Sequence, residues 1–160
     1  MTAVLLAAVA FVGMEGVTYL AHRFLMHGPG IGWHRSHHQR RQGRFERNDL
    51  YPLTFALVTV AAMAAGTAFG GLDALVPVGA GVTAYGAAYV FVHDLYVHRR
   101  LPALRARWAL LDRLADAHRV HHLFGGEPYG MLLPWVPADL RERAARTSRS
   151  PFERGAAVPN

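Results

Sequence analysis

The chain has 160 residues, the length of one domain, and it lacks cysteine, which excludes disulfides, thiolate metal sites and cysteine nucleophiles. Its formal charge is +6, and all 17 basic residues are arginine. No arginine precedes Arg23 or lies between Asn48 and His98. Such long arginine-free stretches argue against nucleic acid as a partner and are typical of proteins that span a lipid bilayer.

The first apolar stretch is residues 1–21, in which Glu15 is the only charged residue. As a helix it would be about 31 Å long, enough to cross the hydrocarbon layer. A cleaved signal peptide is disfavoured because no basic residue precedes the apolar run. A carboxylate facing lipid is costly, so we expect Glu15 to face the bundle or a polar cavity. There it either orients a ligand of the site or bonds a neighbouring helix near the interface.

This helix should continue through His22 and end near His27, because Gly28-Pro29-Gly30 follows. Residues five apart on an ideal helix point about 140° apart. His22 and His27 can therefore converge only if the last turn unwinds or widens, as at a helix end or a π-bulge.

A polar segment opens at Trp33, a residue type that anchors at the membrane interface. His34, His37 and His38 follow at spacings of three and four, which predicts that they form one stripe of a helix.

Two further spans are predicted at residues 50–72 and 74–92. Asn48 and Asp49 precede the first of them and can cap it. Asn48 is also a candidate for orienting a ligand. Small residues in the second allow close helix contact.

His93 and His98 lie where the third span ends, with Asp94 between them. Asp94 either orients an imidazole of the site or is a capping or solvated charge. Both alternatives remain open from the sequence.

Residues 103–124 are predicted to form an amphipathic surface helix that delivers the last histidines to the site. Its apolar face is spaced by three and four residues and runs directly into two histidines: Leu104, Trp108, Leu111, Ala115, His118 and His122. Residues 1–140 are therefore expected to form one membrane-bound domain of the all-α class. Residues 141–160 are expected to be a polar, disordered tail.

The charge pattern also predicts an orientation. Residues 22–49 and 93–160 carry every arginine and every histidine. The positive-inside rule then puts both segments on the cytoplasmic side of the inner membrane and the amino terminus outside.

The histidines fall into four short boxes, and the second pair repeats the spacing of the first: His22 and His27; His34, His37 and His38; His93 and His98; His118, His121 and His122. Imidazole in such repeated groups indicates metal ligands, and ten are too many for one ion. We expect two ions in a cytoplasmic cap. Spacing alone leaves iron, zinc and copper open. A site at the inner ends of the spans favours oxidation of a lipid. A transporter or sensor is the alternative, but transport predicts ligands near the membrane midplane.

The boxes and the stretches around them resemble the bacterial carotenoid 3-hydroxylases (β-carotene hydroxylases) of the fatty-acid hydroxylase/sterol desaturase superfamily. The resemblance covers about residues 11–125 and rests on GMEG at 13–16, HRFLMHG at 22–28, WHRSHH at 33–38, FERNDLY at 45–51, GAGVTAYG at 79–86, VHDLYVHRR at 92–100 and HRVHH at 118–122.

The resemblance implies a non-haem di-iron monooxygenase that uses O2 and external electrons from a ferredoxin-type donor. It implies hydroxylation of carbon 3 of a β-ionone ring, from β-carotene through cryptoxanthin to zeaxanthin. It also implies that all ten histidines are iron ligands. A related di-iron hydroxylase or desaturase acting on another lipid, such as a fatty acyl chain, is the alternative. The chain departs from the family after the last box, at residues 125–131.

Overall fold

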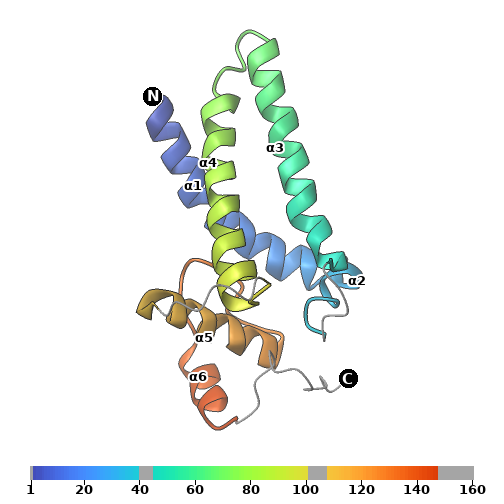
Figure 1. The fold of residues 1–160 in the computed structure, drawn as a ribbon, viewed down its shortest axis with the longest axis vertical. Helices are drawn as coiled ribbons and strands as arrows, with labels where there is room; N and C mark the ends of the chain where they lie inside the picture. Colours follow the sequence, from blue (N-terminus) through green and yellow to red (C-terminus); the bar gives the residue numbers. More distant parts are fainter. Residues whose placement is uncertain (1, 40–44, 101–107, 148–160) are drawn as a thin grey trace.

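The computed structural model describes residues 2–39, 45–100 and 108–147, and over these residues it is helical, without strands. Three helices, each long and apolar enough to cross a membrane, stand beside one another (Figure 1). They are α1 (Ala3–Leu20), which continues as the π-helical segment η1 (Ala21–Met26); the 3-10 turn η2 (Arg47–Asp49) with α3 (Leu50–Ala68); and α4 (Leu75–Tyr89), which continues as the π-helical segment η3 (Val90–Val97). The predicted all-α class and three spans are confirmed.

The helix α4 is the centre of the bundle, because both α1 and α3 pack along it. Glycines on α4 make these contacts close. A methyl group at Gly81 would overlap the Ala7 carbonyl of α1, and one at Gly79 would overlap the Met63 side chain of α3. The small residues therefore have the packing role that the sequence predicted.

The helices α1 and α3 also carry large exposed apolar side chains, such as Val12 and Leu57, which suits contact with lipid.

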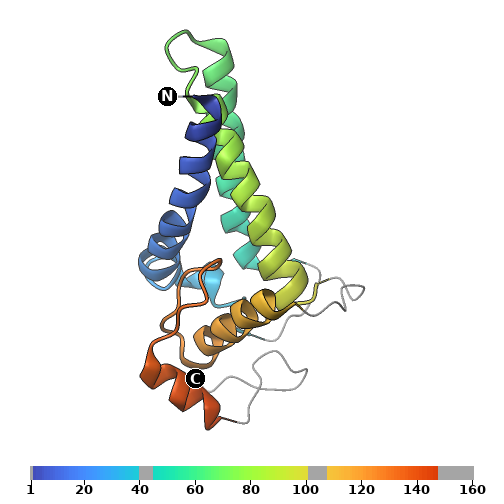
Figure 2. The ribbon, with the colours of Figure 1, turned by 90° about the vertical axis from the view of Figure 1, so that its left-hand side faces the viewer.

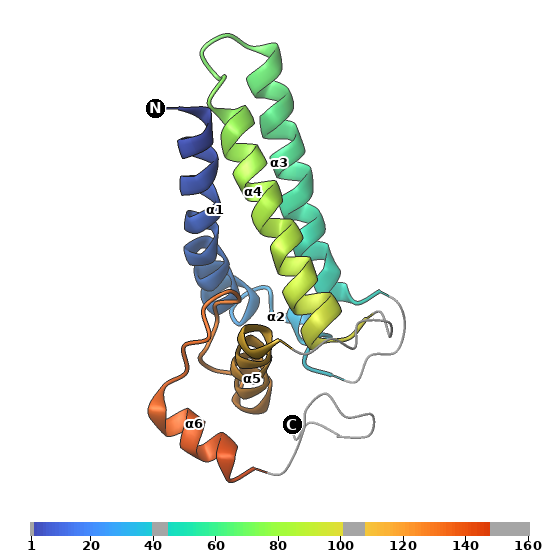
Figure 3. The same ribbon diagram turned by 60° about the vertical axis from the view of Figure 1, so that its left-hand side comes forward.

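A cap of shorter helices lies at one end of the bundle. The amino terminus and the α3–α4 turn lie at the other end (Figure 2). The cap contains α2 (Ile31–His34), α5 (Ala109–Phe124) and α6 (Ala138–Ala145). The helix α5 lies below the lower ends of α1 and α4 (Figure 3) and packs against η3. Leu114 of α5, Val92 and Val97 of η3, and Met131 form the buried core between them.

Three expectations need correction or restriction. The second box is not one helical stripe: α2 ends at His34, and residues 35–38 form turns held by i to i+3 hydrogen bonds. The surface helix begins at Ala109, since Trp108 is extended, and residues 103–107 of the predicted helix lie outside the described residues.

The expected disordered tail is wrong for its first residues. Residues 141–145 belong to α6, which packs against α5 and buries Ala144. Residues 148–160 lie outside the described part of the chain.

Candidate metal centre

The structure brings all ten histidines together at the cap end of the bundle. The candidate ligand atoms in each of two clusters lie within 4.8 Å of one another. The first cluster contains His22, His27, His34, His38 and His121, and the second contains His37, His93, His98 and His118. His122 lies beside the second cluster, with its Nε2 2.9 Å from Nε2 of His118, and its ring stacks on His38 of the first.

Each cluster takes all but one of its histidines from one half of the chain and the remaining one from the other half. The first takes the first two boxes except His37, together with His121 from the last box. The second takes the third box and His118, together with His37 from the second box. In each case it is the middle histidine of a three-histidine box that crosses over. The early and late halves of the chain are therefore linked by the site itself.

Widened helix ends let the five-residue boxes converge. The backbone N–H of His27 donates to the carbonyl of His22 at 3.0 Å, and that of His98 donates to His93 at 2.9 Å. These i to i+5 bonds belong to η1 and η3 and reduce the angle between the paired histidines. For the first box this is the distortion that the sequence required. The third box, His93 and His98, has the same distortion.

In the first cluster, neutral oxygen atoms hold the imidazoles. Nδ1 of His34 donates to Oδ1 of Asn48 at 2.8 Å. Nδ1 of His22 donates to the carbonyl of Tyr129 at 2.9 Å, and Nδ1 of His121 donates to that of Gly126 at 2.6 Å. Asn48 thus makes the contact expected of a residue that orients a ligand, rather than capping α3 with its side chain. Backbone carbonyls have no sequence signature, so the other two acceptors were not predicted.

In the second cluster, carboxylates accept the Nδ1–H groups of two imidazoles. Nδ1 of His93 donates to Asp94 at 2.8 Å, which is the orienting contact that was one of the two alternatives. Nδ1 of His37 donates to Glu46 at 3.3 Å. Arg100 joins these carboxylates, since its guanidinium lies 3.3 Å from Asp94, 3.7 Å from Glu46 and 2.7 Å from Asp49. Glu46, Asp49 and Arg100 were not predicted as site residues.

These hydrogen bonds fix where the imidazole lone pairs point. An oxygen that can only accept requires the hydrogen on Nδ1, so Nε2 carries the lone pair in a neutral imidazole. Nε2 of His22 faces Nε2 of His34 at 3.0 Å, and Nε2 of His37 faces Nε2 of His93 at 2.9 Å. Lone pairs that face each other at such distances repel unless a cation lies between them. The donor set therefore fits a metal ion in each cluster.

Burial favours the neutral form of six of these imidazoles. Loss of water contact lowers the pKa of His34 to about 4 and that of His38 to about 3. Burial first, and neighbouring imidazoles second, also hold the pKa well below its ordinary value at four further positions, which are His37, His118, His121 and His122. Neutral imidazole is the form that binds a metal ion.

Glu15 makes contacts other than those expected of a residue that orients a ligand. Its carboxylate accepts the backbone N–H groups of Met131, Leu132 and Leu133 at 2.9, 3.0 and 3.2 Å, and the hydroxyl of Tyr85 at 2.6 Å. It therefore faces the bundle, as expected, and fixes the segment that follows α5 to α1. The same segment supplies the carbonyls of Gly126 and Tyr129, which accept from His121 and His22. Glu15 therefore acts on the site indirectly, by holding this segment.

An apolar cavity of about 320 Å³ reaches the first cluster from within the bundle. His22 and Asn48 lie at one end of it, and its walls come from α1, α3 and α4. The site can therefore be approached by an apolar molecule from the side of the spans.

Comparison with known proteins agrees with this arrangement. The chain matches the fatty acid hydroxylase family over residues 7–139. It is 43% identical over 148 residues to a beta-carotene hydroxylase of Pantoea ananas, which covers 87% of this chain and 83% of that protein. It is 37% identical to a beta-carotene hydroxylase of Paracoccus sp. (81% of this chain, 80% of that protein).

A plant relative is similar over a smaller share of its length. The chain is 41% identical to the chloroplastic beta-carotene 3-hydroxylase 2 of Arabidopsis thaliana, over 78% of this chain and 43% of that protein. No solved structure matches the chain. From its match over residues 7–139, and from relatives that share most of its length, the chain belongs to the fatty acid hydroxylase family.

Proposed function

We propose that the two clusters hold two non-haem iron ions. The ligands of one ion are His22, His27, His34, His38 and His121, and those of the other are His37, His93, His98, His118 and His122. The observation that carries this proposal is the set of opposed Nε2 atoms inside each buried cluster.

The spacing of the Nε2 atoms supports six-coordinate ions. Seven contacts between Nε2 atoms in the two proposed ligand sets are 2.9–3.2 Å, and all candidate ligand atoms of each cluster lie within 4.8 Å of one another. Two nitrogens about 2.1 Å from one ion are ~3.0 Å apart at an octahedral angle and ~3.4 Å apart at a tetrahedral one. Five imidazoles on a six-coordinate ion also leave one position for another ligand.

The proposed reaction is hydroxylation of carbon 3 of a carotenoid β-ionone ring, which takes β-carotene through cryptoxanthin to zeaxanthin with O2 and electrons from reduced ferredoxin. The names of the bacterial and plant relatives support the substrate class. The apolar cavity that ends at His22 supports a substrate without charge.

Bound iron would supply the activation of O2 and the oxidation of an unactivated CH2 group. The protein's own groups do the rest. The carbonyls of Tyr129 and Gly126 and the oxygens of Asn48, Asp94 and Glu46 hold the Nδ1–H of five histidines, so that Nε2 of each would face the ion: His22, His121, His34, His93 and His37. The apolar walls of the cavity position the ring and exclude water.

For topology, we propose that the cap lies on the cytoplasmic side of the inner membrane and the amino terminus outside. Every arginine lies in residues 22–49 or 93–160, and the described arginines of these segments belong to the cap end, which supports this orientation. The same positive face would steer an acidic ferredoxin toward the site, although topology and headgroup binding alone also account for it.

Expression of the chain in cells that make β-carotene tests the function. Zeaxanthin and cryptoxanthin should appear with the chain and be absent without it. Hydroxylated fatty acid with no hydroxylated carotenoid would reject the carotenoid assignment in favour of the acyl-chain alternative, which the family name suggests.

A further inference from the structure

The cavity that reaches His22 occupies a cleft between two spans. The helices α1 and α3 both pack on α4 (Figure 1), so α4 connects the two sides of the cleft. The cavity is lined by Met14 and Thr18 of α1, by Ala56 and Thr59 of α3, and by Gly86 of α4. From Met14 to His22 the helical rise is about 12 Å. The cavity is therefore long in the direction of the helices and ends at the first cluster.

Gly86 differs from the other glycines of α4. A methyl group at Gly79 or Gly81 would overlap a neighbouring helix, whereas one at Gly86 meets no atom within 4 Å. Gly86 nevertheless lines the cavity. It lies seven residues before His93, about 10 Å along the helix axis. At this position glycine is not needed for helix packing, and its effect is to leave the cavity open partway to the metal centre.

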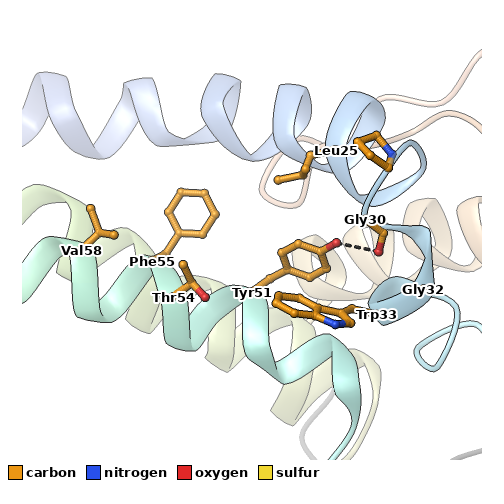
Figure 4. A pocket seen from close by; sticks show the side chains of 9 residues that line it. Leu25, Gly30, Gly32, Trp33, Tyr51, Thr54, Phe55 and Val58 are labelled. Carbon is orange, nitrogen blue, oxygen red and sulfur yellow. Dashed lines mark hydrogen bonds between the residues drawn. The ribbon is translucent and has the colours of Figure 1, made fainter.

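A second, larger groove adjoins the cavity. It has a volume of about 610 Å³ and is lined by Leu25, Trp33 and Val58, together with Tyr51 and Phe55 (Figure 4). Tyr51 and Phe55 line both spaces and so stand between them. Tyr51 is buried, and its hydroxyl donates to the carbonyl of Gly30 at 2.7 Å, whereas Phe55 is 36% exposed. Phe55 is thus the less constrained part of the wall between the groove and the cavity.

We propose that the α1–α3 cleft takes one end of a carotenoid from the lipid, ring first, so that the ring lies at His22 and Asn48 and the polyene passes Gly86. Gly86 is then a specificity-determining residue, because its missing side chain leaves room for the methylated chain. The reacting ring lies at the first cluster rather than the second. This inference rests on the proposed function and adds where the substrate binds.

The chemistry of the walls selects this occupant. The lining residues include no arginine, aspartate or glutamate, so a charged headgroup would find no partner there. The volume lies within the range of sites that bind small apolar molecules. The cavity is continuous with the metal centre at one end, since both His22 and Asn48 line it. An elongated uncharged molecule with a reactive end fits these conditions.

The test compares Gly86→Ala, Gly86→Val and Gly86→Leu with the parent chain, each full length and purified from β-carotene-producing cells. Gly13→Leu is the matched control, because Gly13 is exposed on α1, outside the cavity, and also has no atom within 4 Å of an added methyl group. Ala56→Leu fills the same cavity from α3 and replaces Gly86→Leu if that variant fails to accumulate. The readouts are β-carotene retained per chain, iron per chain and hydroxylated product.

Both retained β-carotene and product should fall progressively from Ala to Leu, by about tenfold or more for Gly86→Leu, with iron content and Gly13→Leu unchanged. Parental binding and turnover in Gly86→Leu or Ala56→Leu would overturn the inference and leave the proposed function intact. A parent chain that retains β-carotene without hydroxylating it would overturn the function instead, and loss of that retention in Gly86→Leu would still support the binding site.

Discussion

Removing the Asp94 carboxylate should weaken metal binding at the second cluster selectively. Asp94→Ala takes away the oxygen that accepts the Nδ1–H of His93 at 2.8 Å and that pairs with Arg100 at 3.3 Å. Asp94→Asn keeps an acceptor and removes only the charge. The first cluster has neutral acceptors and should be little affected, because Asn48 and two carbonyls hold its imidazoles.

The magnitude follows from the geometry. A divalent ion bound at Nε2 of His93 would lie roughly 7 Å from the Asp94 carboxylate, and its two positive charges would give about 5 kcal/mol of attraction at an effective dielectric constant of ~20. The positive charge of Arg100 offsets part of this attraction. A net loss of about 1.4–2.7 kcal/mol, a 10–100-fold weaker affinity, is the expected result for Asp94→Ala. Asp94→Asn should lose less.

The assay is iron per purified chain during titration with a chelator, with Asp73→Ala as control. Asp73 is exposed in the turn between α3 and α4, at the far end of the bundle. Asp94→Ala should pass through a state with one iron per chain, whereas the parent and the control should hold two over the same range. An Asp94→Ala chain that retains both irons as tightly as the parent would refute the reasoning.

Three further predictions concern other parts of the site. His37→Ala and His121→Ala should each abolish hydroxylation without preventing membrane insertion, and His121→Ala should deplete the first cluster although it lies in the late half of the chain; full activity in either variant would remove that residue from the ligands. The thermal midpoint of the metal-free protein should fall as pH drops from 6.5 toward 4: the folded pKa values of His34 and His38 are depressed, so the unfolded chain binds more protons there and folding loses on the order of a few kcal/mol. A midpoint independent of pH over this range would contradict the burial of neutral imidazoles. Glu15→Gln should lower the thermal midpoint, by roughly 1–3 kcal/mol of stability, because the neutral amide is a weaker acceptor for three N–H groups; an unchanged midpoint would show that the segment is held in another way.

The sequence was sufficient to predict the spans and the meeting of the histidines, because both depend on local patterns. Apolar length determines the helices, and the five-residue spacing of His22 and His27 requires a widened turn that η1 provides. Asp94 could be proposed from the sequence because it stands next to His93, whereas Asn48 lies ten residues after His38 and was proposed without such a neighbour.

Contacts between distant parts of the chain were not predictable in this way. The pairing of Arg100 with Asp49 joins residues 51 positions apart, and the Glu15 carboxylate meets N–H groups more than 100 positions away. The exchange of His37 and His121 could not be predicted from the spacing. The sequence of a three-histidine box is the same whichever of the two clusters its middle histidine joins. Helical periodicity even favoured one stripe for the second box, which the turns after His34 break.

Metal analysis of the purified chain, combined with X-ray absorption at the metal edge, tests the central claim most directly. Two iron ions per chain, each in a shell of about six light ligands dominated by imidazole nitrogen, are predicted from the two buried clusters. One ion per chain, or tetrahedral zinc in both clusters, would contradict the account.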